Sequence, residues 1–209
     1  MKVVYCLQSQ NQTRWTGNNL DMGIIVHILS SSYMITLAKT NQVDEILEII
    51  EQTKIIFKNK GIDQWQNGYP NRDSIINDIN NNSGYVYLDN DIVLGYFYIM
   101  YENEITYENI YEGDWLTNKP YFTIHRLTVN ANCRRQGIAS EMFKFISELA
   151  KIKNLNIRVD THNDNNPMKT LLLKSGFKYC GIIELKDKAL RNAYELDIRR
   201  TLWIELLDY

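Results

Sequence analysis

The stretch LTVNANCRRQGIASEMF, residues 127–143, decides how this chain folds. It joins an apolar run that is typical of a strand, at residues 121–130, to a segment whose apolar residues recur at helical spacing, at residues 141–152. Between them lies an Arg-Arg-Gln-Gly turn. A helix start leaves backbone amides free, Gly137 permits close approach of the backbone, and two arginines add charge. Such a turn suits an anion such as a pyrophosphate.

Two known phosphate-binding motifs do not account for this turn. A P-loop needs a Gly-Lys pair and a Rossmann turn needs Gly-x-Gly, and the chain contains neither. The turn is therefore a phosphate-binding candidate of another kind. An exposed basic turn, with a glycine for its geometry, stays open as the alternative.

Composition excludes several classes of protein. The chain has 209 residues and a net charge of −2, from 23 Lys and Arg against 25 Asp and Glu, so a nucleic-acid partner is not expected. Cys6, Cys133 and Cys180 form no CxxC pair, which argues against a metal site and a disulfide framework and favours a cytoplasmic location. The apolar run at residues 23–29 is too short to span a membrane.

The chain divides into an extension and one domain. Residues 1–33 are polar over much of their length and lack helical or strand periodicity, so we interpret them as an N-terminal extension of uncertain status. Residues 34–209 form the predicted domain. Its expected order is strand, two helices, two strands, a long loop, strand, helix, strand, helix and two strands, which is an α/β fold.

The strand before the turn changes the parity of its apolar residues. Phe122 and Ile124 stand at even positions, whereas Leu127 and Val129 stand at odd ones. Because strand side chains alternate between two faces, one extra residue between Ile124 and Leu127 would restore the register. The sequence thus predicts a β-bulge there, with burial of both faces as the alternative. The helix after the turn is expected to bury a stripe of residues: Ile138, Met142, Phe145, Ile146, Leu149 and Ile152.

The turn and a later segment together resemble the GCN5-related N-acetyltransferase (GNAT) superfamily. Motif A of that family, Arg/Gln-x-x-Gly-x-Gly/Ala, matches Arg134, Gly137 and Ala139. The segment HNDNNPMKTLLLKSGFKYCGIIEL, residues 162–185, is similar to the later Asn-helix-Gly-Phe motif. A helix and a strand separate the two blocks, as they do in the family.

The resemblance implies a fold and a cosubstrate. The fold would be a mixed, mostly antiparallel twisted sheet with flanking helices, in which acetyl-CoA lies between two splayed parallel strands, at residues 122–129 and 155–160. The resemblance assigns eleven residues to acetyl-CoA binding: Leu127, Thr128, Val129, Arg134, Arg135, Gln136, Gly137, Ile138, Ala139, Ser140 and Asn165.

The resemblance also implies direct transfer of an acetyl group from acetyl-CoA to a primary amine of a small molecule or peptide. His125, on the strand beside the cleft, is the candidate base, with a structural histidine as the alternative. Many members carry a tyrosine where this chain has Leu172, so the general acid is unassigned. Glu102 and Asp114, in an acidic loop, are candidates for binding the acceptor.

Two other classes of function stay open at this point. A protein that binds acetyl-CoA or CoA as a sensor without turnover would fit the leucine at position 172. A protein-interaction domain with an empty cleft would use exposed tryptophans instead. No membrane partner is expected, and a homodimer stays open as an assembly.

Overall fold

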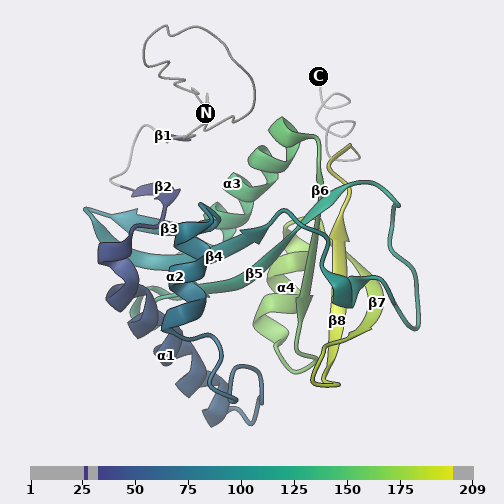
Figure 1. Cartoon of the computed structure of the whole chain (residues 1–209), viewed down its shortest axis with the longest axis horizontal. Coiled ribbons are helices and arrows are strands. Elements are labelled where there is room, and N and C mark those ends of the chain that lie inside the picture. The colour runs from purple at the N-terminus through teal and green to yellow at the C-terminus, as the bar shows by residue number, and fades with distance from the viewer. Residues whose placement is uncertain (1–25, 28–32, 200–209) are drawn as a thin grey trace, which may run out of the picture.

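The computed structural model describes residues 26–27 and 33–199, which form one sheet with helices on both faces (Figure 1). The strands in this part are β1 (Val26–His27), β2 (Tyr33–Leu37), β3 (Gly84–Asp89), β4 (Ile92–Met100), β5 (Tyr121–Val129), β6 (Asn156–Thr161), β7 (Lys178–Glu184) and β8 (Leu190–Leu196). The helices are α1 (Val43–Asn59), α2 (Arg72–Asn80), α3 (Ile138–Lys153) and α4 (Asn166–Lys174), with short 3-10 turns η1 (Thr40–Gln42), η2 (Ile105–Tyr107) and η3 (Ala131–Cys133).

From β2 onward the order of these elements is the predicted one. The described residues add one strand, β1, which pairs antiparallel with β2. Most of the extension predicted at residues 1–33 and the end of the predicted domain, residues 200–209, lie outside the described residues. The division of the chain at residue 34 therefore stays a prediction.

The sheet is mostly antiparallel, with one parallel pair at its centre. Its strand order is β1-β2-β3-β4-β5-β6-β8-β7. The parallel pair is β5 and β6, and their ladder joins only Tyr121–Thr123 to Asn156–Arg158. Beyond Thr123 the two strands diverge. The predicted fold class, a mixed sheet with a splayed parallel pair, is confirmed.

The sheet has an apolar core on each face. In β4, Phe97 and Ile99 belong to a cluster that includes the buried side of α3, whereas Val93 and Tyr96 pack in a second cluster with α1 and α2. Figure 1 shows α1 and α2 in front of the sheet and α3 behind it. Both faces of the central strands are covered, which explains why their apolar residues run nearly without interruption.

The predicted β-bulge lies in β5. Tyr96 of β4 pairs with Thr128, but Tyr98 pairs with His125, so two residues of β5 stand opposite Phe97 alone. The extra backbone bends at Arg126, whose φ of 57° is left-handed. A bulge absorbs such a residue and turns the strand locally. The side chains at positions 125 and 127 are thereby aimed beside the splay of the parallel pair.

Helix α3 begins at the motif A turn and covers the sheet. Five of the six predicted stripe residues are buried, from Ile138 to Leu149. The sixth, Ile152, is 52% exposed, so that part of the prediction is wrong. Ile152 lies in the final turn of the helix, close to the C-cap at Asn154. The helical spacing alone could not show where the helix stops covering the sheet.

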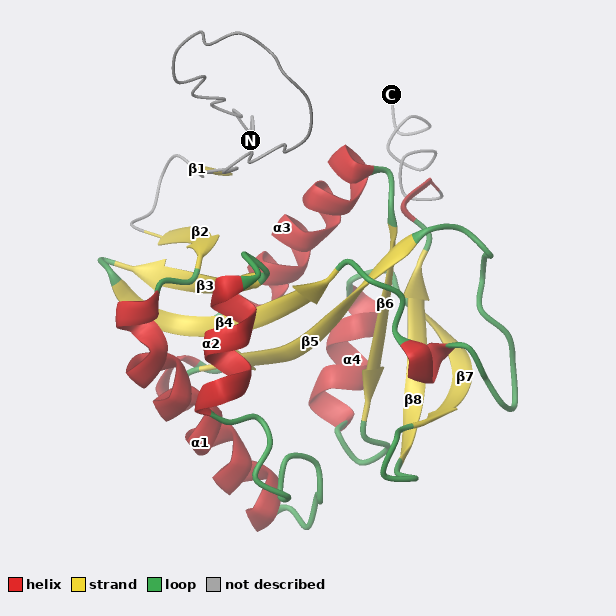
Figure 2. Cartoon of the chain, in the orientation of Figure 1, coloured by secondary structure: helices red, strands yellow, loops and turns green. Residues whose placement is uncertain are grey.

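The long loop between β4 and β5 covers the β6–β8 end of the sheet (Figure 2). Arg158 anchors it from β6, with its guanidinium carbon 4.0 Å from the ring centroids of both Trp115 and Tyr121. The buried carboxylate of Glu195 accepts hydrogen bonds from the Leu116 amide at 3.0 Å and the Thr117 hydroxyl at 2.8 Å. These contacts hold the loop, and with it η2, against the sheet.

Candidate active site

A cavity of about 570 Å³ opens where β5 and β6 diverge and α3 begins. Ten of the eleven residues that the sequence assigned to acetyl-CoA line it: Leu127, Thr128, Val129, Arg134, Arg135, Gly137, Ile138, Ala139, Ser140 and Asn165. The eleventh, Gln136, is exposed and is not among the lining residues. Helix α1 closes the opposite wall with Thr53 and Phe57. We call this space the donor cavity.

The turn before α3 presents unpaired backbone amides to the donor cavity. Gly137 is the N-cap of α3 with a φ of 87°, and Arg135 is also left-handed, with a φ of 64°. The amides of residues 134–140 donate no hydrogen bond to any described residue. A Cβ placed on Gly137 would meet no described atom within 4 Å. The turn therefore offers an open concave surface of N–H groups, which suits an anion.

Positive side chains surround the same turn. Arg134 and Arg135 line the donor cavity, and Lys60, at the end of α1, lines its other side. None of the three forms an ion pair with a described residue. Free amides together with unpaired cations fit the pyrophosphate of a nucleotide-bearing ligand such as CoA.

The start of helix α4 lines the donor cavity. The side chain of its N-cap, Asn165, accepts a hydrogen bond from the Met168 amide at 3.4 Å. Two later residues of this helix and turn belong to the core. Leu172 is completely buried, at 0% exposure, and Phe177 packs edge-to-face on Phe143 with ring centroids 5.4 Å apart. The family tyrosine position is thus occupied by a core leucine.

A second cavity, of about 490 Å³, adjoins the first. The two share four lining residues: Phe57, Leu127, Asn165 and Met168. The second cavity is walled by the aromatic residues Trp65 and Tyr69 of the α1–α2 connection and by residues of β5, β6 and the β7–β8 hairpin. We call it the acceptor cavity. A ligand in one cavity and a ligand in the other would meet beside Leu127 at the bulge.

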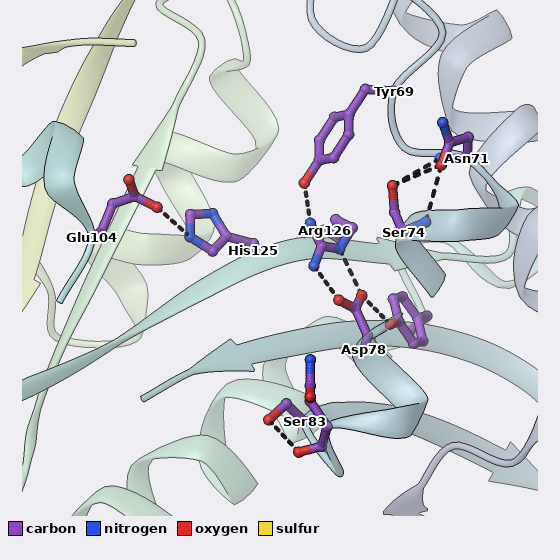
Figure 3. Close-up of polar contacts among 10 residues, drawn as sticks. Tyr69, Asn71, Ser74, Asp78, Ser83, Glu104, His125 and Arg126 are labelled. Carbon is purple, nitrogen blue, oxygen red and sulfur yellow. Dashed lines mark hydrogen bonds and ion pairs between the residues drawn. The ribbon is translucent and has the colours of Figure 1, made fainter. Parts of the chain in front are cut away.

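His125 lines the acceptor cavity and contacts a carboxylate. Its Nε2 lies 3.4 Å from Oε2 of Glu104 (Figure 3). The His125 ring also stacks on Tyr98, with ring centroids 6.1 Å apart. The contact with His125 lowers the pKa of Glu104 to about 2, assisted by hydrogen bonds from Thr106 and opposed by burial. Glu104 is therefore ionised at neutral pH and faces the imidazole with a negative charge.

The bulge residue Arg126 is fixed to α2. Its Nε and Nη2 donate to the two carboxylate oxygens of Asp78 at 2.8 and 2.5 Å, and Tyr96 donates to Oδ2 of Asp78 at 2.6 Å (Figure 3). Nη1 of Arg126 hydrogen-bonds the hydroxyl of Tyr69. Burial raises the pKa of Asp78, and the Arg126 charge opposes that shift. The charged bidentate pair holds the bulge and one aromatic wall of the acceptor cavity together.

The acceptor residues predicted from sequence fall outside the cavity. Glu102 and Asp114 are exposed and are not among the lining residues, so their role stays a prediction. Sequence reasoning gave no role to several residues that do line it: Tyr69, Arg126, Asp160, Lys186 and Arg191. The alternating pattern of β6 and β8 could place Asp160 and Arg191 on one face, but spacing alone does not say that this face borders a cavity.

Comparison with known proteins assigns the family. The sequence profile of the Acetyltransferase (GNAT) family matches residues 44–177, which is more than half of the chain. A GNAT-family acetyltransferase from Streptococcus agalactiae 2603 is 35% identical, over 78% of this chain and 94% of that one, with a TM-score of 0.71. The chain therefore belongs to the GNAT acetyltransferase family. No curated protein matches its sequence.

More distant solved structures share the fold alone. An N-acetyltransferase from Staphylococcus aureus Mu50 is 22% identical over 80% of this chain and 99% of that one, with a TM-score of 0.58. A GNAT-family acetyltransferase from Listeria monocytogenes 4b F2365 is 16% identical over 82% and 99%, with a TM-score of 0.61. Among the described residues, no helix is long and apolar enough to cross a membrane, and no cluster of ligand side chains is arranged for a metal ion.

Proposed function

We propose that this protein is an N-acetyltransferase that transfers an acetyl group directly from acetyl-CoA to a primary amine of a small molecule or peptide. The observation that carries the proposal is the meeting of the donor and acceptor cavities at Leu127, Asn165 and Met168. Two reactants bound on either side of that junction need no covalent enzyme intermediate, because each has its own cavity. Positioning of this kind lowers the entropic cost of the reaction.

The donor cavity fits acetyl-CoA in charge and shape. The free amides of residues 134–140, with Arg134 and Arg135, would hold the pyrophosphate. The edge of β5 beyond Thr123 has no ladder partner on β6, so Leu127 and Val129 would hydrogen-bond the pantetheine arm. Acetyl-CoA, when bound, supplies a thioester whose carbonyl carbon an amine attacks, with loss of the thiolate.

His125 is the proposed base on the acceptor side. An amine is protonated at neutral pH and must lose that proton before it attacks. The imidazole lines the acceptor cavity, and the ionised Glu104, 3.4 Å away, would stabilise the imidazolium that forms. This pairing of an imidazole with an orienting carboxylate supports the base role over a purely structural one.

The acid that protonates the leaving thiolate is a different group from the one that the family pattern names. Leu172 has no acidic group that could donate a proton, and its side chain is completely buried. Tyr69 lines the acceptor cavity and carries a phenolic hydroxyl. Burial raises the pKa of this hydroxyl, so it stays protonated at neutral pH. We propose Tyr69 as the candidate, positioned by its hydrogen bond with Arg126.

One assay tests the proposed function against the sensor alternative. Purified protein is incubated with acetyl-CoA and a panel of primary amines, and thiol release and acetylated product are measured together. The proposal expects amine-dependent thiol release matched by acetylated amine. Tight acetyl-CoA binding without product from any amine would instead support a sensor. We place the protein in the cytoplasm on its cysteine usage, and a homodimer stays untested.

A further inference from the structure

Arg191 is a buried cation that lines the acceptor cavity without a partner of opposite charge. It lies on β8 and is 8% exposed. Its Nη1 donates to the carbonyl of Leu190 at 2.9 Å, and it forms no ion pair with any described residue. Arg126, the other buried arginine of the cavity, is neutralised by Asp78. A buried guanidinium that faces a cavity without a counter-charge favours an anion from outside.

The sheet register places Arg191 on the same face as an acidic residue. Asp160 pairs with Ala193, and Arg191 is two residues from Ala193 along β8, so the two charged residues are diagonal neighbours. Diagonal neighbours in a sheet lie about 7–8 Å apart, within reach of a long side chain, yet the structure forms no ion pair between these two residues. Oδ1 of Asp160 accepts a hydrogen bond from the Tyr107 hydroxyl at 2.7 Å instead. The cavity therefore presents separated charges of both signs.

The remaining charges of the acceptor cavity are distributed in the same way. Glu104 and His125 lie on the side of the bulge, near the junction with the donor cavity. Lys186 and Asp187 both line the cavity from the β7–β8 hairpin, next to the strand that carries Arg191, and both are exposed. Because the exposed Lys186 and Asp187 carry opposite charges, Arg191 is the buried charge that a ligand would meet at the hairpin end of the cavity.

We propose that the acceptor amine also carries an anionic group, which Arg191 binds while the amine faces Glu104 and Asp160. An amino acid or another amine with a carboxylate fits best, because a guanidinium binds a carboxylate through two parallel hydrogen bonds. A phosphate group offers the same chemistry. This inference rests on the proposed function and specifies the class of acceptor that the acceptor cavity selects.

The test uses matched sets of amines that differ only in the anionic group. For three lengths, glycine, β-alanine and 4-aminobutanoate are compared with their amides and with alkylamines, and 2-aminoethyl phosphate is added. The wild-type protein is expected to prefer anionic members by at least about tenfold in kcat/KM, mostly through KM, as loss of a charged hydrogen bond implies. The carboxylate and phosphate members then show which anion is bound.

Two substitutions at one position assign that preference to Arg191. Arg191→Gln should lower kcat/KM with the anionic amines to the level that the neutral amines reach in the same variant, and Arg191→Lys should restore part of the preference. Lys188→Gln is the matched control, because Lys188 lies on the same hairpin, pairs with Glu184 at 2.7 Å and is not among the cavity-lining residues. Thermal unfolding of each variant shows whether it folds.

The outcomes separate this inference from the proposed function. Equal use of anionic and neutral amines by the wild-type protein would overturn the inference and leave the proposed function standing. A preference for anionic amines that persists in the Arg191→Gln variant would also overturn the inference and leave the proposed function standing. If the Arg191→Gln variant does not fold, two other results decide whether the inference holds. They are the preference of the wild-type protein for anionic amines and a weaker preference in the Arg191→Lys variant. Failure to acetylate any amine overturns both.

Discussion

The donor and acceptor cavities adjoin each other but are built in different ways. The donor cavity depends mainly on one continuous turn, residues 134–140, whose free backbone amides are the proposed binding groups. The acceptor cavity is assembled from side chains of segments far apart in the chain, among them Trp65, His125, Asp160 and Arg191. A backbone site tolerates changes of side chain, whereas a side-chain site changes with each substitution. The two cavities should therefore respond differently to mutation.

The largest expected effect separates chemistry from donor binding. His125→Ala should lower kcat by about 10²–10⁴-fold, the usual contribution of a positioned acid or base, with acetyl-CoA affinity unchanged. Steady-state turnover and calorimetric titration of the same sample measure the two quantities. Unchanged turnover would remove His125 from the mechanism. A lower affinity of the variant for acetyl-CoA would show that His125 also contributes to the donor cavity.

The next effect concerns the bulge that joins the cavities. Arg126→Met leaves the carboxyl of Asp78 buried, at 1% exposure, without its charged partner. Breaking a buried ion pair in this way costs about 3–5 kcal/mol in the free energy of unfolding. Urea unfolding measures the loss. The double variant Arg126→Met/Asp78→Asn should recover part of it, and equal instability of the single and double variants would contradict the assignment.

A matched pair of glycines tests the donor turn. Gly137→Ala and Gly176→Ala both place a side chain at a φ of 87°, and each should cost about 1–2 kcal/mol of stability. Gly176 is not among the lining residues of either cavity, and its Cβ would meet Leu196 at an ordinary 3.4 Å. Only Gly137→Ala should weaken acetyl-CoA binding. Calorimetric titration with acetyl-CoA compares the two, and equal affinities would remove the turn as the pyrophosphate site.

The smallest expected effect is a pH dependence on the acceptor side. Folding lowers the pKa of Glu104 from 4.5 to about 2, so its ionised form stabilises the folded protein above pH 4.5. That contribution is lost as the pH falls from 4.5 toward 2. Glu104→Gln should therefore lower stability by about 1 kcal/mol at neutral pH. Urea unfolding of both proteins from pH 7 to pH 3 should show the difference shrinking. A constant difference would contradict the contact with His125.

The same contrast explains how much could be predicted from the sequence. The donor turn is local: the strand, glycine and helix start stand within residues 121–140, and nine of the eleven assigned residues lie in this stretch and line the cavity. The bulge was predictable because alternation in β5 changes parity at one place. The end of the buried stripe on α3 could not be predicted from the sequence. Ile152 has the helical spacing of the stripe but is exposed, because the last turn of the helix is not covered by the sheet.

The acceptor cavity could not be predicted because its residues come together only in the folded chain. The acidic loop was identified, but the structure brings Glu104 into the cavity and leaves Glu102 and Asp114 outside its lining. The 3-10 turn η2 makes that choice, since Glu104 is its N-cap and accepts a hydrogen bond from the Thr106 amide. The sheet register that makes Asp160 and Arg191 diagonal neighbours is likewise a long-range property.

The most direct test of the account is titration of the wild-type protein with acetyl-CoA and with S-acetylpantetheine, which lacks the nucleotide and its pyrophosphate. If the turn at residues 134–140 holds the pyrophosphate, acetyl-CoA binds with one site per chain and S-acetylpantetheine binds at least about tenfold more weakly, as expected for the loss of charge-assisted hydrogen bonds. Equal affinities, or no binding of acetyl-CoA at millimolar concentration, would contradict the assignment of this turn.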